Sequence, residues 1–312
     1  NKKDMRISRL LLRFSGLVMV VLLMSQTACA GPLRDRIMER RAEKRAKTAV
    51  NDVRVLRDVA YGRHAKQRMD VYLPPQADAA PVIFMVHGGA WRLGDKEAEA
   101  VVDNKVAHWV SKGFILVSTN YRLLPEAAPL EQALDVTRAL VAAQDKAASW
   151  GGDPGKFILM GHSAGAHLVA LLAAFPDKAY KLGAQPWLGA VLLDSAALDV
   201  VQIMENKHAR FYDQAFGDNP AYWRATSPFH VLEPFAPPFL AVCSNSRDTA
   251  CTQAEEFAAK ARALRVSVTV LPQDLSHKDI IQQLGTEGAY TEAVEAFMES
   301  LDDSLLPTSM EH

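Results

Sequence analysis

The sequence predicts an α/β fold with a mostly parallel central sheet and helices on both faces. Short apolar runs alternate with longer segments of helical periodicity, and the later runs are apolar throughout, as in strands that are covered on both faces. The predicted strands are residues 53–59, 68–73, 82–86, 114–119, 157–160, 190–193, 239–242 and 266–271. The predicted helices are residues 130–148, 163–174, 252–264 and 287–301.

Two parts of this pattern differ from the rest. The first two strands alternate apolar and polar residues, which predicts antiparallel strands at an edge of the sheet. Residues 200–231 break the alternation of strands and helices, and we expect an irregular segment over the C-terminal edge of the sheet. Its aromatic residues are candidates for lining an acyl or alcohol pocket, with ordinary packing as the alternative. They are Phe211, Tyr212, Phe216, Tyr222 and Trp223.

Composition excludes several classes of protein. Hydrophobic residues make up 49% of the chain, which excludes a disordered protein, and the formal net charge of −1 provides no field for nucleic acid. The nine histidines show no paired spacing typical of metal ligands. No G-x-G-x-x-G follows the first strand. We therefore expect neither nucleic-acid binding nor a metal or organic cofactor.

Residues 1–30 have the pattern of an export signal. A basic stretch precedes an uncharged apolar run at 17–24, and Ala28-Cys29-Ala30 matches an A-x-A cleavage site. The apolar run is too short to cross a bilayer, which takes about 20 residues. We expect cleavage after Ala30 and a periplasmic or secreted protein. The alternative is a lipoprotein anchored to the membrane through Cys29, although Gln26 departs from the usual lipoprotein pattern.

The rest of the chain divides into a polar helical linker at 31–52, a folded domain at 53–303 and a C-terminal tail at 304–312. Export would place the domain in an oxidising compartment, so Cys243 and Cys251 are a candidate disulfide. Such a bond would stabilise the fold by about 2–3 kcal/mol. The alternative is a pair of reduced thiols.

A candidate nucleophile lies between the strand at 157–160 and the helix that follows it. The segment Gly161-His162-Ser163-Ala164-Gly165 is a G-x-S-x-G, which in this context presents the serine hydroxyl on a sharp turn above the sheet edge. A serine hydroxyl needs a base and an anion-stabilising site to act as a nucleophile. If Ser163 is the nucleophile, we expect a base and an anion-stabilising site elsewhere in the chain.

A glycine-rich turn, His87-Gly88-Gly89-Ala90-Trp91, follows the strand at 82–86 and is the candidate oxyanion site. In such a turn backbone N–H groups can point into the site. We expect the amides of Gly88, Gly89 and Ala164 to hold the negative oxygen of a tetrahedral intermediate. His87 is expected to fix the loop by hydrogen bonds.

His277 is the candidate base, because it follows the last predicted strand at the edge where α/β sheets place their sites. Asp248, after the strand at 239–242, is the candidate acid that orients it and completes the chain order Ser, Asp, His. Asp274 is the main alternative to Asp248 but lies on the same loop as the base. Asp194 and Asp199, after an earlier strand, come third.

Several segments together make the chain resemble the α/β-hydrolase esterase/lipase family, particularly its bacterial carboxylesterase, feruloyl/acetylxylan esterase-like and arylformamidase branch. These segments are QRMDVYLP from Gln67, HGGAWRLGDK from His87, NYRL from Asn120, GGDP from Gly151 and GHSAGAHL from Gly161. The resemblance implies the α/β-hydrolase fold and ester hydrolysis without a cofactor. Ala90 departs from it, because a third glycine is common there, and this restricts the loop backbone.

The sequence therefore predicts a serine hydrolase that cleaves small-molecule carboxylic esters by acyl transfer through Ser163, His277 and Asp248. The alternatives are an arylformamidase-like amide hydrolase or a serine peptidase. Outside enzymes, the alternative is a catalytically silent binding module of the same fold. The sequence indicates neither the acyl length nor the oligomeric state.

Overall fold

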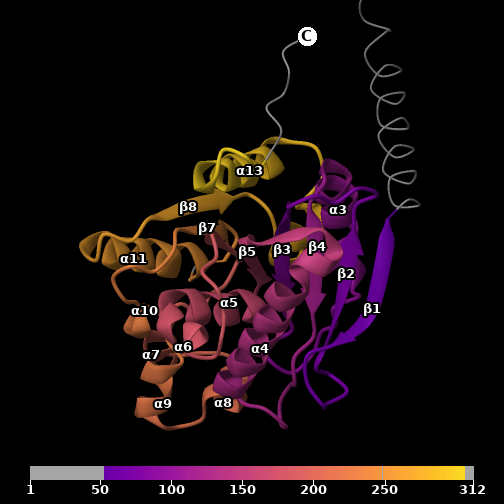
Figure 1. Ribbon diagram of the computed structural model, residues 1–312. Coiled ribbons are helices and arrows are strands. Elements are labelled where there is room, and N and C mark those ends of the chain that lie inside the picture. Colours follow the sequence, from indigo (N-terminus) through magenta and orange to yellow (C-terminus); the bar gives the residue numbers. More distant parts are fainter. Residues whose placement is uncertain (1–52, 248, 306–312) are drawn as a thin grey trace, which may run out of the picture. The chain divides into compact units, whose positions relative to one another are not determined.

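The computed structural model describes residues 53–247 and 249–305 (Figure 1). The predicted signal, linker and lipidation site and the end of the predicted tail lie outside the described residues. So does Asp248.

The core of the described chain is an eight-stranded sheet. In chain order its strands are β1 (Arg54–Ala60), β2 (Arg68–Leu73), β3 (Ala80–Val86), β4 (Ile115–Thr119), β5 (Gly152–His162), β6 (Gly189–Leu193), β7 (Phe239–Ser244) and β8 (Val268–Gln273). Their order across the sheet is β1-β2-β4-β3-β5-β6-β7-β8. The pairs β1–β2 and β2–β4 are antiparallel, whereas all pairs from β4 to β8 are parallel. The predicted fold class is confirmed. Both β1 and β2 are antiparallel as predicted, but only β1 lies at the edge, because β2 pairs with β1 on one side and β4 on the other.

Helices cover both faces of this sheet. The longer ones are α3 (Glu99–Trp109), α4 (Pro129–Ala147), α5 (Ala164–Ala174), α11 (Ala250–Ala263) and α13 (Ala289–Leu301). The shorter ones are α6 (Pro176–Tyr180), α7 (Val200–Met204), α8 (Arg210–Phe216), α9 (Pro220–Ala225), α10 (Pro228–Val231) and α12 (His277–Gln283).

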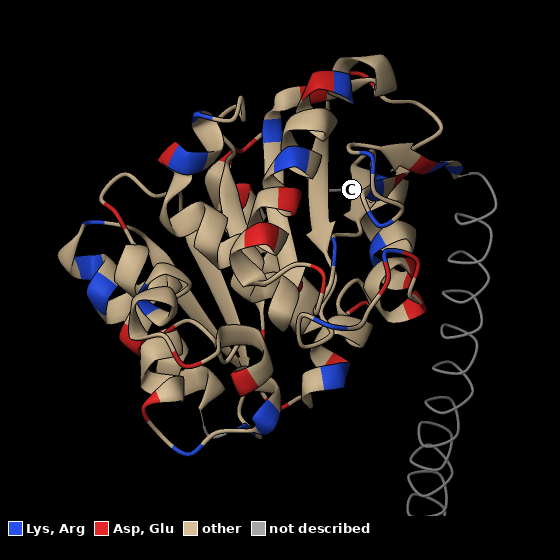
Figure 2. Cartoon of the chain, turned by 90° about the horizontal axis from the view of Figure 1, so that it is seen from below, with Lys and Arg blue, Asp and Glu red and all other residues tan. Residues whose placement is uncertain are grey.

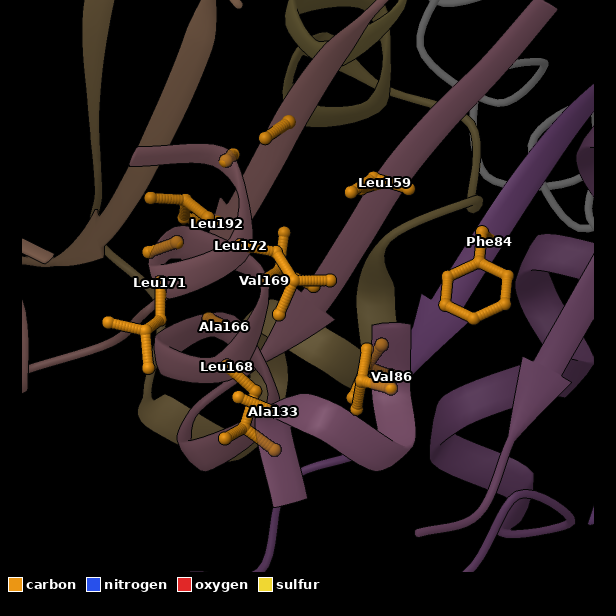
Figure 3. Close-up of a cluster of buried hydrophobic side chains, with 14 of the residues drawn as sticks. Phe84, Val86, Ala133, Leu159, Ala166, Leu168, Val169, Leu171, Leu172 and Leu192 are labelled. Atoms are coloured by element: carbon orange, nitrogen blue, oxygen red, sulfur yellow. The ribbon is translucent and has the colours of Figure 1, made fainter. Parts of the chain in front are cut away.

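Strand β3 shows how the two faces are separated. Successive side chains of a strand point to opposite faces, so Phe84 packs in the apolar layer with α4, α5 and α11. Ile83 and Met85 pack in the other layer, with α3, α12 and α13. Figure 3 shows part of the first layer, where side chains of α5 gather beside those of β3, β5 and β6. Because β3 to β7 are buried on both faces, the carboxyl ends of these strands are held in fixed positions at one edge.

The structure differs from the sequence-based prediction in two segments. The stretch 200–231, expected to be irregular, contains the four short helices α7 to α10. Proline occupies the first turn of α9 and α10, and the Asp199 and Asn219 side chains cap α7 and α9, so these three helices have start signals of their own. Helix α8 begins without a side-chain cap. The candidate base, expected in a loop, is the first residue of α12.

Basic and acidic residues are interspersed along the helices and loops of the described chain (Figure 2). No helix among the described residues combines the length and the apolar character that crossing a membrane would take.

Candidate active site

Ser163 sits on the turn between β5 and α5, where the backbone changes direction within one residue. Its φ of 54° and ψ of −119° lie outside the helical and extended regions. The turn packs tightly against the end of β3: a Cβ on Gly165 would come within 2.3 Å of the Val86 backbone oxygen. Only glycine therefore allows the start of α5 to approach β3 this closely. The result is a serine hydroxyl presented at the carboxyl edge of the sheet.

His277 brings an imidazole to this hydroxyl from the far end of the chain. Its Nε2 lies 3.0 Å from the Oγ of Ser163. Ser276 caps α12 by accepting a hydrogen bond from the Asp279 amide, which fixes the start of the helix on which His277 lies. The distance is that of a hydrogen bond, in which the serine hydroxyl can donate to a neutral imidazole.

The other ring nitrogen of His277 faces a carboxylate from β6. Its Nδ1 lies 2.5 Å from Oδ2 of Asp194, the residue directly after that strand. The Asp194 side chain is fully buried, and its Oδ1 accepts a hydrogen bond of 2.9 Å from the Ser244 amide. Burial opposes ionisation, but hydrogen bonds from His277, Arg247 and this amide lower the pKa of Asp194 to about 2. The carboxylate is therefore charged wherever the protein is folded near neutral pH.

The acid next to the imidazole is thus a different one from that predicted. Asp248 lies outside the described residues, and the carboxylate at Nδ1 is that of Asp194, a third-placed candidate from the sequence. Asp274 accepts a hydrogen bond from the Asn245 side chain, and Asp199 caps α7. The signal for Asp194 was present: it directly follows a fully buried strand, at the edge where Ser163 also lies.

Arg247 is a second site residue that the sequence did not indicate. Its Nη1 lies 2.7 Å from Asp194 Oδ2, 3.0 Å from the Asp194 backbone oxygen and 2.9 Å from His277 Nδ1. Its guanidinium therefore contacts both the buried carboxylate and the imidazole.

The glycine-rich turn after β3 lies against the nucleophile. A Cβ on Gly88 would be only 3.0 Å from the Cβ of Ser163, so the backbone of this turn passes directly beside the serine. The chain reverses direction after Gly89, whose backbone oxygen accepts hydrogen bonds from the amides of Arg92 and Leu93. Ala90, at the position where a third glycine is common, takes a left-handed φ of 50°.

Neighbouring histidines hold this turn and the base in place. The buried His87 stacks on Tyr121 at 4.6 Å, and Tyr121 donates a hydrogen bond to the His87 backbone oxygen. The Nε2 of His162 lies 3.0 Å from the backbone oxygen of His277. Burial lowers the pKa of His162 to about 3, helped by the nearby His277, so its neutral ring donates to that oxygen. These histidines therefore support the site loops.

Trp91 joins the glycine-rich turn to the segment 200–231. Its Nε1 donates to Nδ1 of the buried His167, and its ring lies 4.9 Å from that of Phe216 and 5.9 Å from that of Tyr212. Phe211 completes this aromatic group at 6.4 Å. Three of the five aromatic residues considered for a pocket thus form a packed wall with Trp91. The other two bond elsewhere: the Tyr222 hydroxyl accepts from the Leu130 amide, and the Trp223 Nε1 donates to the Gly217 backbone oxygen.

A cavity of about 500 Å³ lies next to this wall. Its lining combines aromatic, aliphatic and polar groups. It includes Ala196, Ile203, His208, Tyr212, Thr249 and Gln253. Ala196 comes two residues after Asp194, and Thr249 two residues after Arg247, so the cavity adjoins the acid side of the site.

A disulfide closes the loop that bears Arg247. Cys243, the buried residue near the end of β7, is bonded to Cys251 at the start of α11, with a Cα–Cα distance of 5.1 Å. Within this loop the Ser244 hydroxyl donates to the Leu275 backbone oxygen at 2.6 Å, two residues before His277. The disulfide therefore encloses a loop that contacts both Asp194 and Leu275, which lies just before His277 in the chain.

Comparison with known proteins agrees with this architecture. The model of the BD-FAE family matches residues 69–260. The esterase LipQ of Mycobacterium tuberculosis is 31% identical over 235 residues, which cover 69% of this chain and 55% of LipQ, so the chain spans about half the length of that relative. The kynurenine formamidase of Danio rerio is 27% identical over 74% of this chain and 78% of its own. Among solved structures, Esterase B from Lactobacillus rhamnosis superposes with a TM-score of 0.66 at 19% identity, covering 87% of this chain and 94% of its own.

Proposed function

Since the chain belongs to the BD-FAE family of α/β-hydrolase proteins, we propose that it is a serine hydrolase that cleaves carboxylic esters by acyl transfer. The observation that carries the proposal is the unbroken series of contacts from Ser163 Oγ to His277 Nε2 and from His277 Nδ1 to Asp194 Oδ2. A nucleophile, a base and an orienting acid in this order are the requirements of acyl transfer. Similarity to proteins named as esterases supports the same reaction.

In the proposed reaction Ser163 attacks the ester carbonyl while its hydroxyl proton moves to Nε2 of His277. The bond from Oγ to the carbonyl carbon forms, and the carbonyl oxygen takes the negative charge. When the tetrahedral intermediate collapses, the bond to the alcohol oxygen breaks and the proton on Nε2 goes to that oxygen. Water then repeats the sequence on the acyl-enzyme: its proton passes to His277 and returns to Ser163 as the carboxylic acid leaves.

In this proposal Asp194, and not Asp248, is the acid that orients His277. A carboxylate at Nδ1 holds the imidazole in the tautomer whose Nε2 is free to accept the serine proton, and it stabilises the imidazolium that forms. This role requires a charged carboxylate, and the low pKa of Asp194 keeps it charged at neutral pH.

The oxyanion hole in this proposal consists of the amides of Ala164, Gly88 and Gly89. The closeness of Gly88 to Ser163 supports this choice, as does the position of Ala164 as the first residue of α5, where an N–H has no partner within the helix. Losing one such donor costs about 3–4 kcal/mol of transition-state stabilisation.

The experiment that tests the proposal is the substitution Ser163→Ala with p-nitrophenyl acetate and butyrate as substrates. Removing a triad nucleophile lowers turnover by about 10⁶-fold in the best-studied case, so activity should fall to background. A fluorophosphonate probe should label the native chain at Ser163. A variant that keeps most of its activity, or a native chain that takes no label, would contradict the proposal and favour the silent binding module.

Amide hydrolysis is the second candidate, supported by the similarity to a formamidase over most of both chains. The same residues serve it, with the leaving amine taking the proton from His277 in place of an alcohol. A substrate panel of acetyl, butyryl, longer acyl and feruloyl esters together with an aryl formamide distinguishes the two by their kcat/KM values.

We also propose that the domain works outside the cytoplasm, after removal of residues 1–30. The disulfide between Cys243 and Cys251 supports this, because such bonds persist mainly in oxidising compartments. Mass spectrometry of the mature N-terminus after expression in a bacterial host tests it. A free amino terminus at Gly31 supports the soluble form, and a lipid-modified Cys29 supports the anchored one.

A further inference from the structure

Arg247 contacts two of the three groups proposed to carry the reaction. Its position lies on the seven-residue loop between Cys243 and Cys251, which are eight positions apart in the sequence and joined by the disulfide. The Nη1 nitrogen of this single side chain reaches Asp194 Oδ2, the Asp194 backbone oxygen and His277 Nδ1. Its side chain is 29% exposed, whereas the Asp194 carboxylate that it contacts is fully buried.

The contact between Arg247 and His277 depends on where the imidazole carries its proton. A guanidinium has only donors, so it can bond to Nδ1 only when Nδ1 bears no hydrogen. In the tautomer that can accept the Ser163 proton, Nδ1 carries the hydrogen and donates it to Asp194. Two donors then face each other at 2.9 Å. Arg247 therefore opposes the protonated imidazole, while Asp194 favours it.

The same guanidinium also holds the carboxylate. Asp194 Oδ2 is shared by His277 and Arg247, and Oδ1 is held by the Ser244 amide. Without Arg247 the carboxylate would lose its cationic partner at Oδ2 and would keep only His277 there, with the Ser244 amide at Oδ1. Charge-assisted hydrogen bonds of this kind are the stronger ones in proteins.

We propose that Arg247 is a positioning residue of the active site: it fixes the Asp194 carboxylate and limits how far that carboxylate favours the protonated form of His277. This inference rests on the proposed function, in which His277 must be neutral to accept the Ser163 proton. Arg247 thus widens the pH range over which His277 is unprotonated. The loop closed by the disulfide between Cys243 and Cys251 holds Arg247 in position.

The other charged and titratable groups around His277 are not themselves substituted in the Arg247 variants. On α12 itself Lys278 and Asp279 follow the imidazole. From the elements packed against it, the groups that face the site are Asp194, His162, Tyr212, Tyr290 and Lys105. A change in the pH profile between variants at position 247 therefore reports on the loss of the guanidinium, including its effect on the Asp194 carboxylate.

The test compares Arg247→Met, Arg247→Lys and the control Arg262→Met, an exposed arginine in the last turn of α11. With a p-nitrophenyl ester, Arg247→Met should lower kcat about tenfold, because a hydrogen bond to a charged group is lost. It should also move the acid limb of kcat/KM to higher pH by about one unit. Arg247→Lys keeps the charge, so its acid limb should stay within about 0.3 units of the native one while kcat is partly restored. The control should match the native chain in both.

A role in folding alone would lower kcat without moving the acid limb, and that result overturns the proposal. The NMR titration of the His277 ring protons gives the same comparison without turnover: the ring should protonate at higher pH in Arg247→Met than in the native chain. An equal titration midpoint in the two proteins overturns the proposal as well. Fluorophosphonate labelling distinguishes a failure of the proposed function from a failure of this inference. An unlabelled Ser163 in the native chain counts against the proposed function, whereas a labelled Ser163 with unchanged profiles in the Arg247 variants counts against this inference only.

Discussion

The buried ammonium group of Lys105 hydrogen-bonds to the backbone oxygen of Ile281 and so joins α3 to the helix that begins at His277. The neighbouring Asn104 donates to the Gln282 backbone oxygen at 2.5 Å. Both oxygens belong to the last turn of α12, where carbonyl groups lack helical partners and a cation is favoured. Helix α3 therefore holds one end of α12, while Ser276 caps the end that bears the proposed base.

The substitution Lys105→Met should reveal this buried charge in the pH dependence of stability. Burial lowers the pKa of Lys105 to about 7, although Asp103 opposes the shift. The pKa of Lys105 is lower in the folded chain than the ordinary 10.5, so between about pH 7 and pH 10.5 the unfolded chain binds more protons than the folded one. The free energy of unfolding of the native chain therefore increases as pH rises through this range. Urea unfolding of the native chain and Lys105→Met at about pH 7 and about pH 9.5 measures the effect. The native chain should gain relative to the variant; a difference that stays constant or shrinks would contradict the prediction.

Replacing each of two aspartates decides which one serves His277. Asp194→Asn should lower kcat by about 10⁴-fold, the effect known for the equivalent substitution in a serine protease, because the amide favours the wrong tautomer of the imidazole. Asp248→Asn should leave most of the activity. Both are assayed with the same p-nitrophenyl ester, with fluorophosphonate labelling of Ser163 in parallel. The reverse ranking of the two variants would restore the original assignment of Asp248.

Asp194 should also contribute to stability in acid. Its folded pKa of about 2 lies below the ordinary 3.8, so the carboxylate stabilises the fold fully above about pH 4 and this contribution is lost as pH falls through 2. A shift of this size corresponds to about 2–3 kcal/mol. The native chain should therefore lose more unfolding free energy than Asp194→Asn between about pH 5 and about pH 2.5. The measurement is urea unfolding monitored by circular dichroism. If both proteins lose the same free energy of unfolding, Asp194 is not the cause of the loss of stability in acid.

Much of the fold was predictable because its signals are local. The apolar runs at 82–86, 157–160 and 239–242 became β3, β5 and β7 of a parallel sheet, since strands buried on both faces need no polar alternation. The segment 200–231 was not predicted as helical because its four helices are each shorter than two turns, too short for a 3.6-residue periodicity to appear. The start signals in this segment are local ones, such as Asn219 before Pro220.

The candidate site was predictable only in part, for a reason of geometry. Ser163 and His277 each carry a local sequence context, the strand-turn-helix motif and the last loop before the C-terminal helix. The acid has no such context, because Asp194 and Asp248 both follow parallel strands whose carboxyl ends meet at the same edge. Which of them reaches the imidazole depends on side-chain direction and loop conformation, and neither is encoded in spacing. The partnership of Arg247 with Asp194 depends on the same three-dimensional detail.

Reducing the disulfide between Cys243 and Cys251 should impair both the stability and the chemistry of the native chain. Closing a loop of this length contributes about 2–3 kcal/mol in the chain-entropy model, so the melting temperature should fall on reduction. Activity should fall as well, at temperatures where the reduced protein is still folded, because the freed loop carries Arg247 and the Ser244 amide that together hold Asp194. The measurement is p-nitrophenyl ester hydrolysis with and without a phosphine reductant, with thiol labelling to verify reduction. The matched comparison is Arg247→Met, in which part of what the loop positions is already missing, so reduction should cost that variant a smaller factor in kcat than it costs the native chain. If reduction lowers kcat by the same factor in both proteins, the disulfide acts on the site by a route that does not pass through Arg247.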